Sequence, residues 1–233
     1  MRSDMSISAR DLKRHFGTGA KTVRALDGVS IDLRRGALTL LKGPSGSGKS
    51  SLLAALSGLT RPNQGDVVSL GEELWKLSKW KRTRFRRRNC GFVFQAVGLF
   101  PALTAEQQIM LILEYMSVNK KEARARARAL LDEVGLAGRY SSKPGAMSGG
   151  ENQRVAIARI LAKRPSLIFC DEPTSALDKS NGQLVARLLQ QTAHKENAMV
   201  FCVTHDDRLT PYADRIVEIE DGRLVSDTDM EFV

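Results

Sequence analysis

The sequence predicts an α/β fold in which a mostly parallel sheet is interrupted by an all-helical segment. Short apolar strands alternate with helices before about residue 95 and again after about residue 148, which predicts the sheet. Between residues 96 and 145 the pattern is helical throughout, which predicts a separate lobe. The 233 residues are enough for one domain of ordinary size, or for one domain with a small insertion.

The expected strands are short apolar or alternating runs. Residues 29–33 alternate with period two, as in a half-buried strand. The last two strands flank Asp221-Gly222, a dipeptide typical of a tight hairpin turn. The other strands are expected at residues 37–41, 91–94, 167–170 and 199–203, and those of the hairpin at 215–220 and 223–225.

The expected helices have capping residues at their first turn and Gly or Pro beyond their last. In the inserted segment, Thr104 with Gln107 matches a capping box. Asn119 with Glu122 opens the next helix in a similar way, and Gly135 ends it. The apolar residues that share one face of this second helix are Ala123, Ala127, Leu130, Leu131 and Val134. The other helices are expected at residues 49–57, 151–163 and 181–192.

The net charge of +10 comes largely from one basic run, residues 79–88. Its cations are Lys79, Lys81, Arg82, Arg84, Arg86, Arg87 and Arg88. Such a run suits nucleic-acid phosphates, an anionic lipid surface or a solvated helix face. Nucleic acid is the weakest of these interpretations, because single strands need several aromatic platforms and only Trp80 and Phe85 occur here. A second basic stretch, 120–128, is diluted by alanines and is typical of a solvated helix.

Several classes of protein are excluded by what the sequence lacks. No apolar run approaches the ~18 residues that a transmembrane helix needs, and the first residues lack the apolar core of a secretory signal. The three cysteines, Cys90, Cys170 and Cys202, have no Cys-x-x-Cys spacing and lie beside apolar residues, so we expect buried thiols. We therefore expect a soluble, intracellular protein.

Residues 43–50 match the pattern G-x-x-x-x-G-K-[ST] between an expected strand and an expected helix. Glycines let backbone amides turn toward a polyphosphate, and the following helix N-terminus adds partial positive charge. Lys49 would reach the β- and γ-phosphates, and the Ser50 hydroxyl would ligate Mg²⁺. A chance match is expected in about one chain in a hundred of this size. The pattern therefore predicts nucleoside triphosphate binding, but it does not specify the reaction.

Two carboxylates, Asp171 and Glu172, follow the expected strand at 167–170. The carboxyl ends of parallel strands form the ligand-binding edge of such sheets. Asp171 is placed to hold Mg²⁺, and Glu172 to polarise a water for attack on the γ-phosphate. Alone the pair is also typical of a polar strand end, but beside a phosphate loop it predicts hydrolysis.

The segment 147–154 opens another helix. A capping box accounts for Ser148 and Glu151, but not for Gly149 and Gly150, since glycine is a poor helix starter unless something must approach the backbone. One chain already has its own phosphate loop. We therefore interpret this helix N-terminus as facing a nucleotide held by another subunit.

Taken together, these motifs resemble the nucleotide-binding subunits of ABC transporters nearly from end to end. In that family's terms the motifs are Walker A at 43–50, the Q-loop Gln95, the signature at 147–151, Walker B at 167–171 with Glu172, the D-loop at 175–178, the switch His205, and Phe16 as the aromatic that stacks on adenine.

The resemblance implies a P-loop NTPase core with an N-terminal antiparallel β subdomain and an inserted helical subdomain. One nucleotide-binding domain would span residues 1–233. Its core would comprise about 1–95 and 160–233, and its helical subdomain about 96–159.

The resemblance also implies ATP and Mg²⁺ as ligands and two copies paired head to tail. Each ATP would lie between one phosphate loop and the partner's signature segment, and Asp178 would couple the two sites. The implied catalytic residues are Glu172, His205, Gln95 and Lys49. The implied nucleotide-binding residues are Phe16, Gly43, Pro44, Ser45, Gly46, Ser47, Gly48, Lys49, Ser50, Ser51, Ser148, Gly149, Gly150 and Asp178. The implied metal ligands are Ser50, Gln95 and Asp171.

The function implied is an ATPase that powers a separate membrane permease, peripheral to the cytoplasmic face of the inner membrane, with no nucleic acid as partner. The motifs are most similar to the lipoprotein-release, macrolide-efflux and glycolipid-export branch, which implies export or extraction of a lipid, lipoprotein, peptide or drug. Met147 and Asn152 depart from the usual leucine and glutamine of the signature.

Two alternatives use the same phosphate loop. A soluble ABC-type ATPase acting on nucleic acid or ribosomes usually carries a long coiled coil or a second nucleotide domain. A small-molecule phosphoryl transferase would have no use for residues 148–150.

Overall fold

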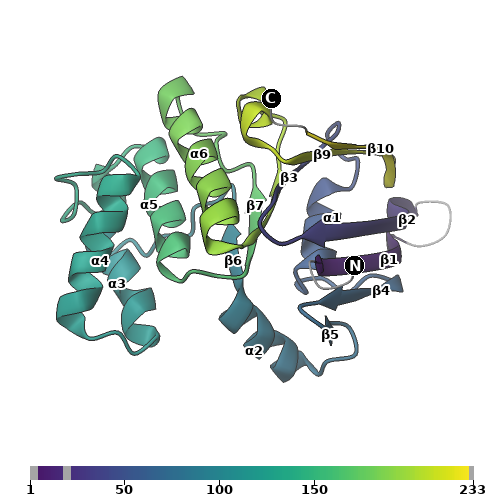
Figure 1. Cartoon of the computed structure of the whole chain (residues 1–233), viewed down its shortest axis with the longest axis horizontal. Coiled ribbons are helices and arrows are strands. Elements are labelled where there is room, and N and C mark those ends of the chain that lie inside the picture. The colour runs from purple at the N-terminus through teal and green to yellow at the C-terminus, as the bar shows by residue number, and fades with distance from the viewer. Residues whose placement is uncertain (1–4, 18–21, 231–233) are drawn as a thin grey trace.

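The computed structural model describes residues 5–17 and 22–230, which form two sheets, the helices around them and a helical lobe (Figure 1). The first sheet is antiparallel, with strand order β2-β1-β4-β5. Its strands are β1 (Met5–Phe16), β2 (Val23–Arg34), β4 (Gln64–Ser69) and β5 (Glu72–Glu73). The second sheet has the order β10-β9-β3-β8-β7-β6. Its strands are β3 (Leu38–Lys42), β6 (Cys90–Val93), β7 (Leu167–Asp171), β8 (Met199–Val203), β9 (Arg215–Glu220) and β10 (Arg223–Asp229).

The second sheet is parallel except at its edge, where β10 pairs antiparallel with β9. Its register places Leu41 of β3 and Asp171 of β7 on either side of Val203 in β8. The loops that follow these three strands therefore leave the sheet at one edge. The predicted mostly parallel α/β core with an antiparallel N-terminal sheet is confirmed.

Both faces of the parallel sheet are covered. Helix α1 (Lys49–Leu56) packs between the two sheets, where Leu52 and Leu56 join Phe169 and Phe201 in one buried cluster. On the opposite face, α5 (Gly149–Ala162) and α6 (Lys179–Glu196) bury residues such as Ile157 and Val185. Parallel strands need this cover because neither of their faces tolerates water.

The helical lobe consists of α3 (Ala105–Tyr115), α4 (Lys120–Glu133) and α5, and it has its own buried cluster. The capping box at Thr104 and Gln107 is complete, as predicted. At the start of α4, Asn119 accepts from the Glu122 amide, but the return bond joins the two side chains. The second box is therefore a variant of the first. Figure 1 shows this lobe on the far side of α6 from the antiparallel sheet.

Some element bounds differ from the sequence expectation. Helix α5 begins at Gly149 and not at residue 151, because Ser148 is its N-cap. Helix α6 begins at Lys179 and extends to Glu196, because Asp178 is its cap. Strand β10 continues to Asp229 because its extra residues still pair with β9.

The basic helix and the cysteines follow the expectation, whereas β1, β4, β5 and the 3₁₀ helices lie in ranges for which no particular element was expected. The basic run forms α2 (Lys79–Asn89), capped by Ser78. Two 3₁₀ helices lie at Pro144–Ala146 and Asp207–Tyr212. All three cysteines are buried and unpaired, and burial raises the pKa of the Cys90 thiol to about 12. Within residues 5–17 and 22–230, no helix has the length and hydropathy of a membrane span.

Candidate functional site

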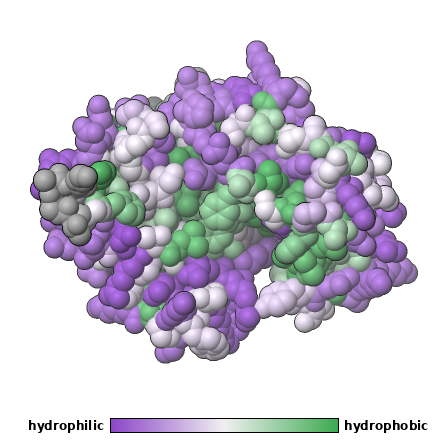
Figure 2. All heavy atoms as spheres, turned by 180° about the vertical axis from the view of Figure 1, so that it is seen from behind, coloured by the Kyte–Doolittle hydropathy of each residue, from purple (hydrophilic) through white to green (hydrophobic). Residues whose placement is uncertain are grey.

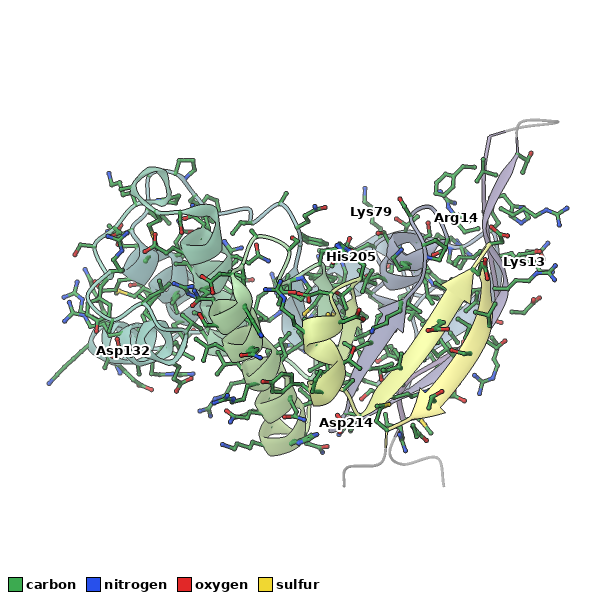
Figure 3. All side chains as sticks on the ribbon, turned by 90° about the horizontal axis from the view of Figure 1, so that it is seen from above. Lys13, Arg14, Lys79, Asp132, His205 and Asp214 are labelled. Carbon is green, nitrogen blue, oxygen red and sulfur yellow. The ribbon has the colours of Figure 1, made fainter. Side chains whose placement is uncertain are left out.

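A cavity of about 400 Å³ opens at the edge of the parallel sheet where β3, β6, β7 and β8 end. Parallel sheets bind their ligands at this edge. Figure 3 shows His205 between the helical lobe and the strands. The residues that line the cavity are Ala25, Ser45, Gly46, Gly48, Lys49, Ser50, Ser51, Gln95, Asp171, Glu172, Val203 and His205. The structure therefore brings together residues from four separate segments of the predicted site.

The loop after β3 is held against neighbouring strands by its glycines. A Cβ on Gly43 would lie 2.1 Å from the carbonyl oxygen of Ile219, and one on Gly48 would lie 2.1 Å from that of Ala25. Gly48 also has a φ of 107°, which disfavours other residues. It begins α1 without any side-chain cap. The first amides of α1 are therefore left for a ligand.

Two polar side chains in this loop, Lys49 and Ser47, would gain new hydrogen-bond partners if an anion bound in the cavity. The Lys49 ammonium bonds to the carbonyl oxygens of Gly43 and Pro44, at 2.8 and 2.7 Å. The buried Ser47 hydroxyl has no hydrogen-bond partner among the residues that the structure describes. Lys49 is thus folded back onto its own loop, and its charge has no carboxylate partner within 4 Å among the described residues.

Two carboxylates, Asp171 and Glu172, form the acidic side of the cavity. The Ser50 hydroxyl donates to the Asp171 carboxylate at 3.3 Å. Burial raises the pKa of Asp171, the neighbouring Glu172 raises it further, and the bond from Ser50 opposes this rise. A nearby cation would remove the cost of that buried charge. Hydroxyl, carboxylate and the Gln95 amide are oxygen donors of the kind that Mg²⁺ prefers.

Glu172 is held by two residues that follow β8. His205 Nδ1 lies 2.7 Å from one of its carboxylate oxygens, and the Thr204 hydroxyl donates to the other at 3.2 Å. Glu172 has a φ of 52°, and its amide bonds to the Val203 carbonyl at 2.9 Å. The left-handed backbone turns the carboxylate into the cavity, where it is positioned to accept a proton from a water.

Phe16 lies beside the cavity but does not line it. It shares a smaller hollow of about 180 Å³ with Ser50 and Ser51, whose other walls include Ala54 and Thr60. Its ring is 47% exposed, and the Arg14 guanidinium lies 4.7 Å from the ring centroid. An exposed aromatic face next to the phosphate loop suits stacking on a base. Gly43, Pro44 and Ser47 complete the loop without lining the cavity.

The predicted residues on α5 are not in the cavity. The Ser148 hydroxyl accepts from the Glu151 amide at 3.1 Å, and the Glu151 carboxylate accepts from the Ser148 amide at 2.8 Å. A Cβ on Gly150 would lie 3.1 Å from the Ala176 carbonyl oxygen, whereas one on Gly149 would meet nothing within 4 Å. A close contact within the chain therefore explains why position 150 is a glycine, whereas no contact among the described residues explains the glycine at position 149.

Asp178 also lies outside the cavity, at the N-terminus of α6. It accepts from the Asn181 amide at 2.9 Å, and this bond, with others from Asn181 and Ser180, lowers its pKa to about 2. A helix cap thus accounts for the residue in the isolated chain.

Sequence reasoning missed a link between the segments that carry His205 and Asp178. Arg208 donates to the carbonyls of Leu177 and Thr174, at 3.0 and 3.2 Å, and forms an ion pair with Asp206. Burial acts to raise the pKa of Asp206, but the bonds from Arg208 and Thr174 outweigh it and hold the pKa at about 2. The only signal in the sequence was an Asp two residues before an Arg, and this pattern is too common to identify a functional residue.

Comparisons with known proteins agree with this geometry. The model of the ABC transporter family matches residues 26–175. The chain is 42% identical over 222 residues to the lipoprotein-releasing system ATP-binding protein LolD 2 of Caulobacter vibrioides, covering 95% of this chain and 97% of that one. It is 38% identical to the macrolide export ATP-binding/permease protein MacB of Neisseria gonorrhoeae, covering 95% of this chain but 34% of that one.

A solved structure shares the fold over almost the whole chain. It is the dimeric post-hydrolysis state of the ATP-binding cassette MJ0796 bound to ADP and Pi, with a TM-score of 0.90 and 32% identity. The match covers 97% of this chain and 100% of that one.

Proposed function

The chain belongs to the ABC transporter family as one of its ATP-binding ATPase subunits, and we propose that two copies pair head to tail and share their active sites. One observation carries this proposal: the cavity holds the phosphate loop, Gln95, Asp171, Glu172 and His205, but not the glycines at the start of α5. The chain alone therefore has half of the predicted site.

The start of α5 offers two backbone amides that could complete the active site of the other copy. The capping box satisfies the amides of Ser148 and Glu151, but those of Gly149 and Gly150 have no carbonyl within the helix to bond. Gly149 is exposed and has open space around it. Two amides at a helix N-terminus make an anion site, which we assign to the γ-phosphate of an ATP held by the other copy.

The donor set of the cavity fits Mg²⁺. The Ser50 hydroxyl, the Asp171 carboxylate and the Gln95 amide would hold the ion together with phosphate oxygens of ATP. Among the described residues, no group of three His, Cys, Asp or Glu side chains forms a metal site of its own. When bound, Mg²⁺ supplies positive charge that neutralises the β- and γ-phosphate oxygens.

The side chains of the cavity have separate roles in hydrolysis. Lys49 exchanges the carbonyls of Gly43 and Pro44 for the β- and γ-phosphates. Glu172 accepts the proton of the attacking water, and His205 and Thr204 hold its two oxygens in place. His205 is 76% exposed, so its ring is free to reach the γ-phosphate as well. Phe16 stacks on the adenine.

We propose that hydrolysis drives a separate permease, with this subunit peripheral to the cytoplasmic face of the inner membrane. The helical subdomain, about 96–159, would carry the contact near Gln95. The relatives support this class, since the MacB relative is named as an ATP-binding and permease protein and the chain matches about a third of its length. The transported molecule would be a lipid, lipoprotein, peptide or drug, exported or extracted.

The test of the shared site is Glu172→Gln. The variant should bind ATP but hydrolyse it roughly 10²–10⁴-fold more slowly, because the amide accepts no proton at neutral pH. Trapped ATP should then hold two copies together, so analytical ultracentrifugation with Mg-ATP should show a dimer. Glu133→Gln, at an exposed site outside the cavity, is the matched control and should behave as wild type. A Glu172→Gln chain that stays monomeric under saturating Mg-ATP would contradict the proposal.

A further inference from the structure

Six of the seven cations of α2 divide into an inward and an outward set, and the seventh, Arg87, lies over the Tyr115 ring. Arg82 donates to the Leu77 carbonyl and lies over the Trp75 ring, and Arg86 donates to the Gly58 carbonyl. These two stabilise the packing of the helix. Lys81, Arg84 and Arg88 instead are exposed, and their spacing of three and four residues places them along one stripe with Trp80 and Lys79 nearby.

Within the described residues, no carboxylate forms an ion pair with this stripe, although Glu72 lines the hollow beside it. The sequence has no Asp or Glu between Glu73 and Glu106, and none of the seven α2 cations forms an ion pair within the part of the chain that the structure describes. Helix α4 also carries arginines, but there Arg124 and Arg128 pair with Glu106 of α3, at 3.2 and 3.0 Å.

The outward cations are not explained by the stability of α2. Basic residues favour a helix C-terminus, which accounts for Arg87 and Arg88, but Lys79 and Lys81 lie in the first turn, where no acidic residue balances them. Arg84 and Arg88 lie four residues apart, and like charges at this spacing destabilise a helix. A negative partner outside the chain would relieve this repulsion.

An exposed aromatic lies within the same stripe. Trp80 is 67% exposed, and the Arg84 guanidinium lies 5.5 Å from its ring centroid. A hollow of about 400 Å³ beside it is lined by all three stripe cations together with Leu77, Phe85 and one carboxylate, Glu72. Tryptophan beside Lys and Arg is typical of residues at a membrane–water interface.

Figure 2 shows a strongly hydrophilic projection at the lower edge of the molecule, where α2 lies, separated by a notch from an apolar patch on the side of the helical lobe. Exposed apolar residues of α3 and its end, Leu111, Tyr115 and Met116, belong to that side. The outward residues of α2 are exposed, so a surface outside the chain can reach them.

We propose that the outward face of α2, formed by Lys79, Trp80, Lys81, Arg84 and Arg88, binds the headgroups of anionic phospholipids at a membrane surface. Cations spread along a helix with a single aromatic anchor suit a layer of phosphate groups. A nucleic acid strand would need several stacking rings, and the stripe offers one. This proposal requires neither the dimer nor the permease, so it stands apart from the shared active site.

The test uses the whole isolated chain and vesicles of phosphatidylcholine with or without phosphatidylglycerol. Wild type should sediment with the anionic vesicles, and added salt should release it. The triple variant Lys81→Gln, Arg84→Gln and Arg88→Gln should lower the partition coefficient roughly 100-fold. Each cation near an anionic surface contributes about 1 kcal/mol, and about 1.4 kcal/mol corresponds to a tenfold change in the coefficient.

A charge-matched control separates the α2 face from bulk charge. Lys120→Gln, Lys121→Gln and Lys195→Gln combined remove the same charge from exposed positions of α4 and α6 and should leave partitioning near wild type. Equal losses in the two triple variants, or equal wild-type binding to neutral vesicles, would overturn the proposal. The ATPase rate of the α2 variant should stay at the wild-type level, because none of the three residues lines the nucleotide cavity.

Fluorescence tests the position of Trp80 directly. The chain has two tryptophans, and Trp75 is only 7% exposed. Anionic vesicles should therefore shift the emission of Trp80 to shorter wavelength, and Trp80→Phe should abolish the shift. An unchanged emission spectrum on anionic vesicles, or a shift produced instead by a DNA or RNA oligonucleotide, would overturn lipid binding.

Discussion

Two helices of this chain, α1 and α5, both start beside glycine, but their first turns are closed in opposite ways. At α1 the N-cap is the left-handed Gly48, no side chain caps the helix, and Gly48 and the first residues of α1 line the cavity. At α5 the Ser148–Glu151 capping box is complete, and the helix start is outside the cavity.

The difference indicates which half of the site needs a second molecule. The α1 start has no side-chain cap, and Lys49 bonds only to carbonyl oxygens of its own loop, so a bound phosphate would supply new partners to both. The α5 start is a stable helix terminus in the free chain, and it has only the Gly149 and Gly150 amides to offer. Changes at α1 should therefore impair each chain, whereas changes at the exposed α5 glycine should impair only the pair.

The largest effect is expected at the α1 side. Lys49→Ala removes the cation that we assign to the β- and γ-phosphates, so ATP affinity should collapse and kcat/KM should fall roughly 10²–10³-fold. Calorimetric titration with Mg-ATP measures the affinity. Lys195→Ala, an exposed lysine of α6, is the control and should bind ATP normally. If Lys49→Ala kept wild-type affinity, the phosphate loop would be misassigned.

At the α5 side, Gly149→Val should leave folding and ATP binding by the single chain intact, since a side chain there meets nothing within 4 Å. Hydrolysis should fall roughly 10²-fold, because a displaced contact is costly in a composite site. Gly145→Val is the control: its site is equally open but lies in the preceding 3₁₀ helix.

Mixing the Lys49→Ala and Gly149→Val chains sharpens the comparison. In a mixed head-to-tail dimer one site receives both changes and the other receives neither. Random pairing would therefore restore about a quarter of the wild-type rate. Two sites that were each complete in one chain would give no recovery at all.

The smallest effect is expected away from both helix starts, at the ion pair of Asp206 and Arg208. This pair joins the segment that carries His205 to the loop before Asp178. Asp206→Asn should lower the free energy of unfolding by about 1–3 kcal/mol at neutral pH. The pKa of Asp206 is lowered from 3.8 to about 2, so its stabilisation is complete above pH 3.8 and is lost as pH falls through about 2.

Urea unfolding at a series of pH values measures this contribution. The gap between wild type and Asp206→Asn should be constant near neutral pH and should narrow below pH 3.8. Asp221→Asn, in the exposed hairpin turn, should show no such gap. A gap at Asp206 that did not change with pH would mean that its charge is not what stabilises the link.

The fold class, most element positions and the burial of the cysteines could be predicted from the sequence. Glycine at Gly58 and Gly135, the capping box at Thr104 and the hairpin at Asp221 are local signals, and the structure confirms them. The site motifs were predicted as a set, and four of their segments line one cavity. The catalytic roles stay predictions.

Other features depend on partners far away in the chain. The pairing of β1 with β4 joins residues about sixty positions apart, and no local pattern specifies its register. Gly150 fits because the Ala176 carbonyl approaches it, and Arg208 matters because two carbonyls of another loop face it.

By itself, the sequence determined the fold class and the approximate positions of most of the expected helices and strands, because caps, turns and the phosphate loop depend on residues close together in the chain. The residues that would touch a nucleotide stay a prediction. Only the tertiary structure decided that the glycines of α5 lie outside the cavity. It also decided that, within the described residues, no cation of α2 forms an ion pair, whereas Arg124 and Arg128 of α4 both pair with Glu106. The reason is physical: local bonds depend on spacing along the chain, whereas the neutralisation of a charge depends on which carboxylate the fold brings within reach.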